Sequence, residues 1–342
     1  MNPTASRAVG LLRRDAHITR LWTILLVLII FFAIVRTGPF LSERTWQSMA
    51  IQFPEFGIMA LGVMVAMITA GIDLSVVGIA NMTGIAAASI MLTMTPKGAD
   101  ANPTVAILVA VAAALVMGVL AGVLNGVLVA KVKIPAILVT LGTLELFTGI
   151  AIIMTAGRPI SGLPTEYSEV VAGKLFGVIP VPLVIFVLVA CLIGFLLRRT
   201  TYGTKLYVLG TNATAARFSG LDSTWLLIKT YALSGLCAAI AGLVMLANYN
   251  SAKADYGVAY TLLTVLIVVL GGVNPNGGSG KLTGVILAIV ILQILSSGLN
   301  MFPNISNFYR PLIYGAVLLI VISTSQFGSG IRTRLTRKDK DS

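Results

Sequence analysis

Charged side chains are scarce in this chain of 342 residues. They make up 11% of it, whereas a soluble domain usually contains about 25%. Hydrophobic residues account for 57%, and the mean hydropathy is +0.96. A water-soluble fold of this length has no place for so much apolar surface. The composition therefore excludes an ordinary soluble protein and indicates a chain with several membrane spans.

Histidine and cysteine are also rare. The single histidine, His17, lies in a basic N-terminal segment, where we expect it to be solvated. Cys191 and Cys237 each lie inside an apolar run and belong to no C-x-x-C pair, so we expect buried, unpaired thiols. A membrane-embedded enzyme needs clustered catalytic side chains, and one histidine in the whole chain argues against one. The phosphate-binding pattern G-x-x-x-x-G-K-[ST] does not occur, so we expect no nucleotide site, metal ion or cofactor on this chain.

Long runs without any charge are present instead. Each is long enough to cross about 30 Å of hydrocarbon as a helix at about 1.5 Å per residue. The strands of a β-barrel need alternating polarity, which these runs lack. The expected fold class is therefore an all-α integral membrane protein. The runs are Leu74–Pro96, Leu175–Leu197, Thr230–Ala252, Tyr256–Gly280, Leu282–Tyr309 and Pro311–Gly330.

We expect about ten transmembrane helices, of which the eighth is short. The first has no small-x-small cleavage site after it, so we interpret it as an uncleaved helix rather than a signal peptide. The expected helices are Leu21–Val35, Ala50–Ala70, Leu74–Thr95, Thr104–Ala130, Pro135–Ala156, Val181–Leu197, Leu227–Tyr249, Ala259–Gly271, Lys281–Gly298 and Pro311–Ser325.

The positive charges predict the orientation. With the N-terminus in the cytoplasm, 17 of the 24 Lys and Arg residues fall in cytoplasmic segments, which favours cytoplasmic N- and C-termini. The net charge of +12 thus reflects topology and not nucleic-acid binding. We expect a basic cytoplasmic segment (1–20), one transmembrane domain (21–328) and a basic cytoplasmic tail (329–342). The largest cytoplasmic connection, residues 198–226, joins the sixth and seventh helices.

That connection contains the signals of a short helix. Asn212 is a good N-cap, alanines are strong helix formers, and Gly220 can end the helix in the left-handed conformation. We expect a helix of about two turns that presents Arg217 and Phe218 to a groove on a soluble partner, with Ala216 inside that groove. A linker helix lying on the lipid headgroups is the alternative. The residues of the segment are Asn212, Ala213, Thr214, Ala215, Ala216, Arg217, Phe218, Ser219 and Gly220.

Four ordered stretches resemble a known family. The loop Tyr202–Gly220 resembles the cytoplasmic loop of bacterial ABC importer permeases for ribose, xylose, other simple sugars and autoinducer-type furanoses, the carbohydrate uptake transporter 2 family. Gly71–Val76 resembles the family's Gly-Ile-Asp-Leu-Ser-Val element, and Ile134–Thr143 its Pro-Ala-Phe-x-x-Thr-Leu-Gly-Thr element. Gly271-Gly272 and Gly277–Gly280 resemble its double-glycine and Gly-Gly-x-Gly pair. The match covers about residues 50–325.

The resemblance implies the function and the partners. It implies a permease subunit of an ATP-driven importer that moves a monosaccharide-like solute across the bacterial inner membrane. It implies a second permease, identical or paralogous, two cytoplasmic ATPase subunits docked on the coupling helices, and a periplasmic binding protein that delivers the solute. ATP and Mg²⁺ belong to the ATPase partners under this interpretation.

Two carboxylates are candidates for the solute pathway. Asp73 follows Gly71 between the second and third helices, where it either caps the third helix or lies at a helix break near the pathway. Glu145 lies near the middle of the fifth helix, where a bare carboxylate costs a few kcal/mol in lipid. The family that the chain resembles usually has a smaller or apolar residue there. We expect Glu145 to contact solute, with a protonated side chain hydrogen-bonded between helices as the alternative.

Two asparagines complete the candidate pathway. Asn125 fits the family's Gly-x-x-Asn-Gly pattern, and an interhelical hydrogen bond is its alternative role. Asn300 begins an outer cluster with Asn304, Asn307 and Arg310, which suits either sugar hydroxyls or an interfacial belt. Gly118 and Gly122 form a G-x-x-x-G pattern and so a plausible close-packing face.

A secondary transporter driven by H⁺ or Na⁺ is the competing function. Glu145 and Asp73 would be its coupling sites. The absence of evident inverted halves and the helix signal at 212–220 argue against it. The segment Tyr260–Thr264 also departs from the family, whose members often carry acidic residues there, so the solute is the least determined feature.

Overall fold

The computed structural model describes residues 16–96, 102–302, 312 and 315–316. Within them are eight helices that are long and apolar enough to cross a membrane. They are α2 Ala16–Val35, α4 Glu43–Ile68, α5 Val76–Met94, α6 Pro103–Ala130, α7 Ala136–Thr155, α9 Val181–Arg199, α12 Ser223–Tyr249 and α14 Leu282–Leu299.

Shorter elements connect the spans. Two antiparallel strand pairs hold these connections: β1 and β4 join the α7–α9 connection to the α12–α13 connection, and β2 and β3 form a hairpin within the α7–α9 connection. The short helices are α3 Thr37–Phe40, α8 Thr165–Val171, α10 Thr201–Thr211, α11 Ala213–Phe218 and α13 Tyr260–Leu270, and the strands are β1 Ile160–Ser161, β2 Lys174–Leu175, β3 Ile179–Pro180 and β4 Ser251–Ala252.

The all-α membrane fold is confirmed, and nine of the ten expected helices are present. The second begins at Glu43 and not at Ala50, because Ser42 caps it and accepts a hydrogen bond from the Thr45 N–H at 3.3 Å. The tenth expected helix, Pro311–Ser325, lies almost wholly outside the described residues, as do most of the two terminal segments. Cys237 is buried as expected, but Cys191 is exposed on α9.

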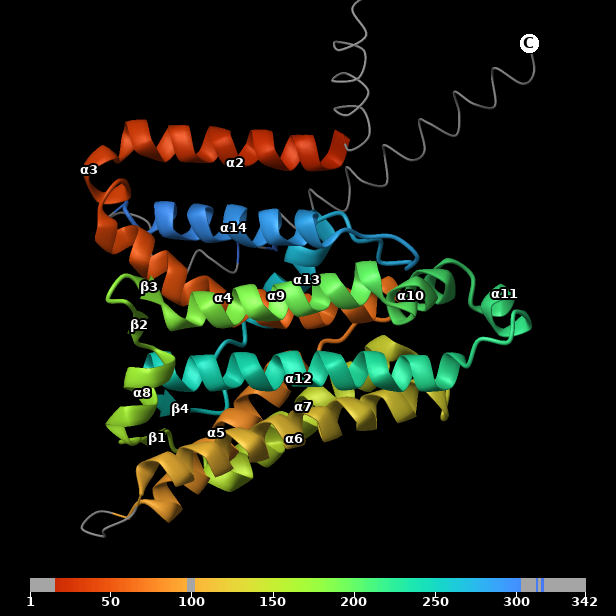
Figure 1. The fold of residues 1–342 in the computed structure, drawn as a ribbon, viewed down its shortest axis with the longest axis horizontal. Helices are drawn as coiled ribbons and strands as arrows, with labels where there is room; N and C mark the ends of the chain where they lie inside the picture. The colour runs from red at the N-terminus through yellow and green to blue at the C-terminus, as the bar shows by residue number, and fades with distance from the viewer. Residues whose placement is uncertain (1–15, 97–101, 303–311, 313–314, 317–342) are drawn as a thin grey trace, which may run out of the picture.

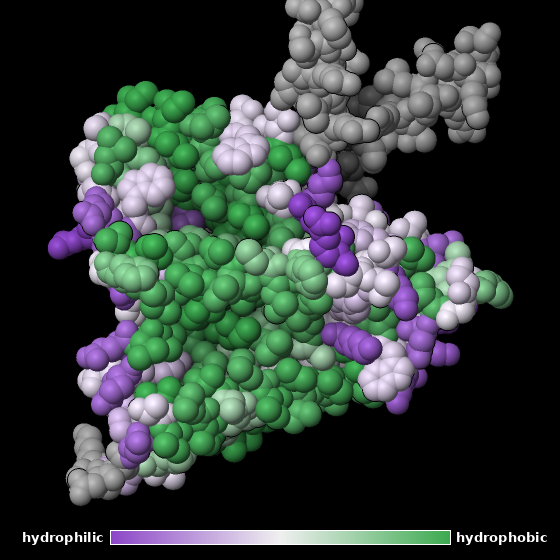
Figure 2. Space-filling model, viewed as in Figure 1, coloured by the Kyte–Doolittle hydropathy of each residue, from purple (hydrophilic) through white to green (hydrophobic). Residues whose placement is uncertain are grey.

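The long helices lie side by side, with α10 and α11 at one end and α8 with the strand pairs at the other (Figure 1). Hydrophobic side chains cover the flank between the two ends, and hydrophilic side chains gather at the ends (Figure 2). This surface pattern is that of a helix bundle crossing a bilayer, with a polar face on each side.

Helix α12 is the centre of the bundle and packs against α4, α5 and α6. Glycines bring α6 and α12 close together. A Cβ at Gly122 would overlap the carbonyl oxygen of Tyr231, and a Cβ at Gly235 would overlap that of Gly118. The predicted close-packing face at Gly118 and Gly122 is therefore confirmed.

The start of α2 lies at the same end of the bundle as the α13–α14 connection. The His17 ring is exposed, but its Nε2 lies 3.0 Å from the carbonyl oxygen of Leu270 at the end of α13, so His17 is not merely solvated as expected. Gly278 of that connection contacts Ile68 at the end of α4. These contacts place the start of α2, the end of α4 and the α13–α14 connection at the α10–α11 end, which the sequence predicts to be the cytoplasmic side.

Candidate functional site

Two helices, not one, form the connection of residues 198–226. Asn212 caps α11, and its Oδ1 accepts a hydrogen bond from the Ala215 N–H at 2.9 Å. Gly220 follows α11 with a φ of +75°, so the predicted short helix and both of its end signals are confirmed. Helix α10 was not predicted. Its signal was Thr200, which caps it by accepting a hydrogen bond from the Gly203 N–H at 3.4 Å.

Helix α11 extends beyond the end of the bundle (Figure 1), and its side chains are exposed apart from Ala216. Phe218 is 89% exposed. Ala216 is fully buried against the chain's own core, so the expectation that it lies in a partner's groove is wrong. Arg217 is exposed too, and its Nε donates to the Ser223 hydroxyl at 3.3 Å. Phe218 and Arg217 are thus the two large exposed side chains of α11.

Direct backbone contact joins α10 to α4 and to the α13–α14 connection. The Gly278 N–H donates to the carbonyl oxygen of Ile68, the last residue of α4, at 2.9 Å. A Cβ at Gly210 of α10 would overlap that carbonyl oxygen and come within 2.5 Å of the Gly278 nitrogen. The Gly-Gly-x-Gly motif at 277–280 therefore serves close backbone approach. If α10 is displaced, the movement is therefore transmitted to α4 through backbone atoms and not through a flexible side chain.

Side-chain hydrogen bonds also join α10 to the α13–α14 connection and to α12. The Tyr207 hydroxyl donates to the carbonyl oxygen of Gly280 at 2.9 Å, and the hydroxyls of Tyr202 and Thr230 share a hydrogen bond of 3.0 Å. Burial raises the pKa of Tyr202 to about 12, so this group stays neutral near pH 7. Helix α10 is thereby held to α12 and to the α13–α14 connection, which gives α11 a rigid base.

Asp73 and Asn125 lie together at the break between α4 and α5. Asp73 Oδ1 accepts hydrogen bonds from the Ser75 N–H at 3.0 Å and the Ser75 hydroxyl at 2.6 Å. Asn125 Nδ2 of α6 donates to the same hydroxyl at 2.7 Å. All three residues are fully buried. Asp73 therefore lies at a helix break inside the bundle and accepts from the N–H of Ser75, which is the N-cap residue of α5, while its place near a solute pathway stays a prediction.

Replacing Asp73 by alanine should lower the free energy of unfolding by about 1–3 kcal/mol, because the buried Ser75 N–H and hydroxyl lose their acceptor. Thermal unfolding of the purified protein in detergent measures this. Thr93→Val is the matched control, since its exposed hydroxyl bonds only within its own helix. We expect the control to stay within about 0.5 kcal/mol. An Asp73→Ala protein as stable as wild type would show that this network does not hold the break.

The other two predicted pathway residues lie elsewhere. Glu145 is on the exposed face of α7, midway along the helix, together with Leu141. No hydrogen bond among the described residues joins it to Asp73 or Asn125. Asn300 is exposed at the end of α14, where it is the C-cap. Its expected neighbours Asn304, Asn307 and Arg310 lie outside the described residues.

Helix α4 contains a buried carboxylate that was not among the predicted site residues. Glu55 is 1% exposed, and its Oε1 accepts a hydrogen bond from Asn248 Nδ2 at 2.8 Å. Its Oε2 accepts from the hydroxyls of Tyr249 at 2.7 Å and Tyr260 at 3.3 Å. A carboxylate inside a spanning helix is costly and therefore needs such partners. The reasoning applied to Glu145 would have found it, because Glu55 also interrupts an apolar segment.

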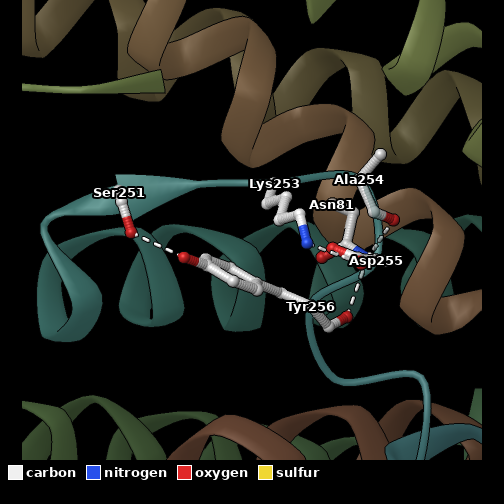
Figure 3. Close-up of polar contacts among 6 residues, drawn as sticks. All are labelled: Asn81, Ser251, Lys253, Ala254, Asp255 and Tyr256. Carbon is white, nitrogen blue, oxygen red and sulfur yellow. Dashed lines mark hydrogen bonds and ion pairs between the residues drawn. The ribbon is translucent and has the colours of Figure 1, made fainter. Parts of the chain in front are cut away.

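Polar contacts also hold the connection between α12 and α13, residues 250–259. Asn81 of α5 is buried, and its Nδ2 donates to the carbonyl oxygens of Ala254 at 2.9 Å and Tyr256 at 2.8 Å (Figure 3). The hydroxyls of Ser251 and Tyr256 share a hydrogen bond of 2.8 Å. This connection is thus pinned to a spanning helix rather than lying free on the outer surface.

An ion pair and a cavity accompany this connection. Lys253 Nζ lies 2.8 Å from Asp255 Oδ2, and the hydrogen bond between them raises the pKa of Lys253 (Figure 3). The cavity has a volume of about 490 Å³ and is broadly open to the surface. Its lining residues are Asn248, Tyr249, Ser251, Tyr256 and Gly257.

Comparison with known proteins identifies the family. Residues 46–322 match the profile of the branched-chain amino acid transport system / permease component family. The chain belongs to this permease family. The permease is 34% identical to the ribose import permease protein RbsC of Bacillus subtilis (strain 168), over 87% of this chain and 89% of that relative.

Further relatives agree with this assignment. The permease is 34% identical to the ribose import permease protein RbsC of Escherichia coli (strain K12), over 90% of this chain and 95% of the relative. It is 35% identical to the autoinducer 2 import system permease protein LsrD of Yersinia enterocolitica serotype O:8 / biotype 1B, over 54% of this chain and 57% of that relative. No solved structure matches the permease.

Family membership confirms the predicted class, a multi-pass transport permease of the bacterial inner membrane related to sugar and autoinducer importers. The ion-coupled alternative is not favoured. Its two coupling candidates, Glu145 on the exposed face of α7 and Asp73 in a buried network, are not joined in the described part of the chain.

Proposed function

We propose that the permease is the membrane subunit of an ATP-binding-cassette importer for a monosaccharide-like solute, such as a sugar, deoxysugar, polyol or furanose signal. Relatives named for the import of ribose and of autoinducer 2 support this solute class. Separate cytoplasmic ATPase subunits hydrolyse ATP, and a periplasmic binding protein delivers the solute to the outer face. The permease itself then carries out no chemical reaction and binds no nucleotide.

The observation that carries this proposal is the arrangement of α11 and α10. An exposed Phe218 at the tip of α11 suits a groove on a soluble partner. The base of α11 touches the end of α4 backbone to backbone through Gly210 and Gly278. Closure of two ATPase subunits would therefore move α4, next to the break at Asp73, and alternate the access of the pathway.

Reconstitution tests the function. The permease, its ATPase and its binding protein are placed in liposomes, and uptake of labelled ribose is measured with and without ATP on the ATPase side. Uptake should require ATP and all three proteins, and it should not change when proton and sodium gradients are abolished. Uptake that follows such a gradient without ATP would overturn the proposal.

The exposure of Glu145 on α7 supports the proposal that a second permease subunit packs against this face. In lipid a carboxylate at mid-helix costs about 2.5–3.5 kcal/mol, so an exposed Glu145 requires protein or water beside it. Gly142 and Gly149 lie on the same face, and open space surrounds their Cα atoms on that side. A second copy packed there would enclose Glu145 in a shared polar pathway.

Replacing Glu145 by leucine distinguishes a second permease subunit on the α7 face from lipid on that face. If a second copy or the pathway faces α7, uptake should fall at least about tenfold with an unchanged yield of folded protein, because a pathway carboxylate is lost. The measurement is ATP-driven ribose uptake normalised to the amount of complex recovered. A variant that gains thermal stability and keeps full uptake would place Glu145 in lipid and contradict the arrangement.

A further inference from the structure

The connection between α12 and α13 runs at membrane depth. Helix α13 has 11 residues and so spans only about 16 Å at 1.5 Å per residue, roughly half of the hydrocarbon core. Asn81, which is 6% exposed in α5, holds the carbonyl oxygens of Ala254 and Tyr256 from within the bundle (Figure 3). Non-helical backbone at such depth is stable only where protein buries it or where it lines a wet cavity.

The cavity beside this connection has the size and lining of a small-molecule site. Its volume of about 490 Å³ falls within the range of about 300–1,000 Å³ found for ligand pockets. Two tyrosine rings lie on its wall, with Tyr249 and Tyr256 centroids 5.3 Å apart. Hydroxyl and amide groups from Ser251, Tyr256 and Asn248 provide hydrogen-bonding partners. Aromatic faces next to hydroxyls and amides are the chemistry that binds sugar rings and their hydroxyls.

Glu55 accepts hydrogen bonds from two lining residues of this cavity, Asn248 and Tyr249, and so fixes their positions. Tyr249 is 45% exposed, and its hydroxyl donates to Glu55 Oε2 at 2.7 Å. Asn248 Nδ2 donates both to Glu55 Oε1 at 2.8 Å and to the carbonyl oxygen of Ile51 at 3.2 Å, which fixes the orientation of its amide. The amide oxygen of Asn248 is buried without a partner among the described residues. A buried acceptor without a partner is costly, and a hydroxyl donor that reached this oxygen would remove that cost.

The absence of charge in the cavity lining favours a neutral solute over an amino acid. None of the five lining residues is charged. Lys253 and Asp255 pair with each other outside the lining. An amino acid is a zwitterion and would need a cation for its carboxylate and an anion for its ammonium group. A neutral solute with many hydroxyls needs neither.

We propose that this cavity is a solute-binding site of the permease, built for a neutral, hydroxyl-rich ring of pentose size. Tyr249 and Tyr256 contact the ring face, and Asn248 and Ser251 bind hydroxyls. Glu55 is a positioning residue that acts through Tyr249 and Asn248. The inference rests on the proposed import function and specifies where in this chain the solute is held.

Binding is tested first, on the purified permease without ATP. Val258→Trp places an indole next to the lining residue Gly257 as a fluorescence reporter and leaves the side chains of the cavity wall unchanged, since Val258 is 65% exposed. Millimolar ribose should change its emission in a saturable way, whereas millimolar valine should not. A matched reporter, Tyr167→Trp, lies outside the cavity and should not respond to either, since the Tyr167 hydroxyl donates to the carbonyl oxygen of Leu243 within the bundle. A response to valine alone, or none to ribose, overturns the proposal.

Transport provides the second test, on the complete complex in liposomes with loaded binding protein. Glu55→Gln and Tyr249→Phe each remove one hydrogen-bonding arrangement of the wall, so ribose transported per ATP hydrolysed should fall about tenfold. Tyr167→Phe should keep the wild-type ratio. Equal losses in all three variants would indicate a packing effect and overturn the proposal, as would unchanged ratios. A wild-type complex without ATP-driven uptake would instead refute the import function, while the fluorescence result still decides the cavity.

Discussion

Replacing Gly210 by alanine should abolish ATP-driven uptake while the membrane bundle remains folded. The added Cβ would overlap the carbonyl oxygen of Ile68 and crowd the Gly278 nitrogen, and both are backbone atoms that cannot rotate away. The end of α10 must therefore move away from α4, and the close backbone approach of Gly210 to Ile68 is lost. We expect uptake to fall at least about a hundredfold, which corresponds to roughly 3 kcal/mol of coupling.

The measurement is ribose uptake together with ATPase activity in the reconstituted complex. ATPase activity should persist and no longer respond to the binding protein, because the ATPase still docks on α11. Gly38→Ala is the matched control, since open space surrounds Gly38 and its substitution should leave uptake unchanged. Full uptake by Gly210→Ala would show that force does not pass through this backbone contact.

Replacing Phe218 by glutamate should detach the ATPase subunits. Phe218 is 89% exposed at the tip of α11, and an aromatic anchor at the centre of an interface contributes about 2 kcal/mol or more. A charge in its place must also be desolvated inside the partner's groove. We expect the ATPase to dissociate at least about thirtyfold more readily and uptake to be lost. The permease should keep its thermal stability, because the side chain has few contacts within its own chain.

The readout is the amount of ATPase that copurifies with the permease. Phe176→Glu is the matched control. Phe176 is 92% exposed, but it lies in the β2–β3 turn on the opposite side of the bundle. Its substitution should leave the copurified ATPase unchanged. If Phe218→Glu retains the ATPase and Phe176→Glu loses it, the orientation of the whole permease in the membrane is reversed.

The contrast between Ala216 and Phe218 shows the limit of sequence reasoning for the coupling segment. Asn212 and Gly220 act on backbone groups within a few residues, so the helix and its ends could be predicted locally. Which side chains face the partner depends on how α11 rests on the rest of the chain. Phe218 is exposed as expected, but Ala216 is buried against the rest of the chain, and that burial does not follow from the sequence around it.

The sequence alone determined the class of the protein. Uncharged runs of spanning length and the caps of α11 are local or additive properties, and the fold agrees with them. The orientation indicated by the distribution of Lys and Arg stays a prediction. The tertiary structure alone decided the sites. It joined Asp73 to Asn125, surrounded Glu55 with Tyr249 and Tyr260, and left Glu145 exposed. A spanning helix is apolar on every side, so its periodicity does not reveal which face meets another helix and which meets lipid.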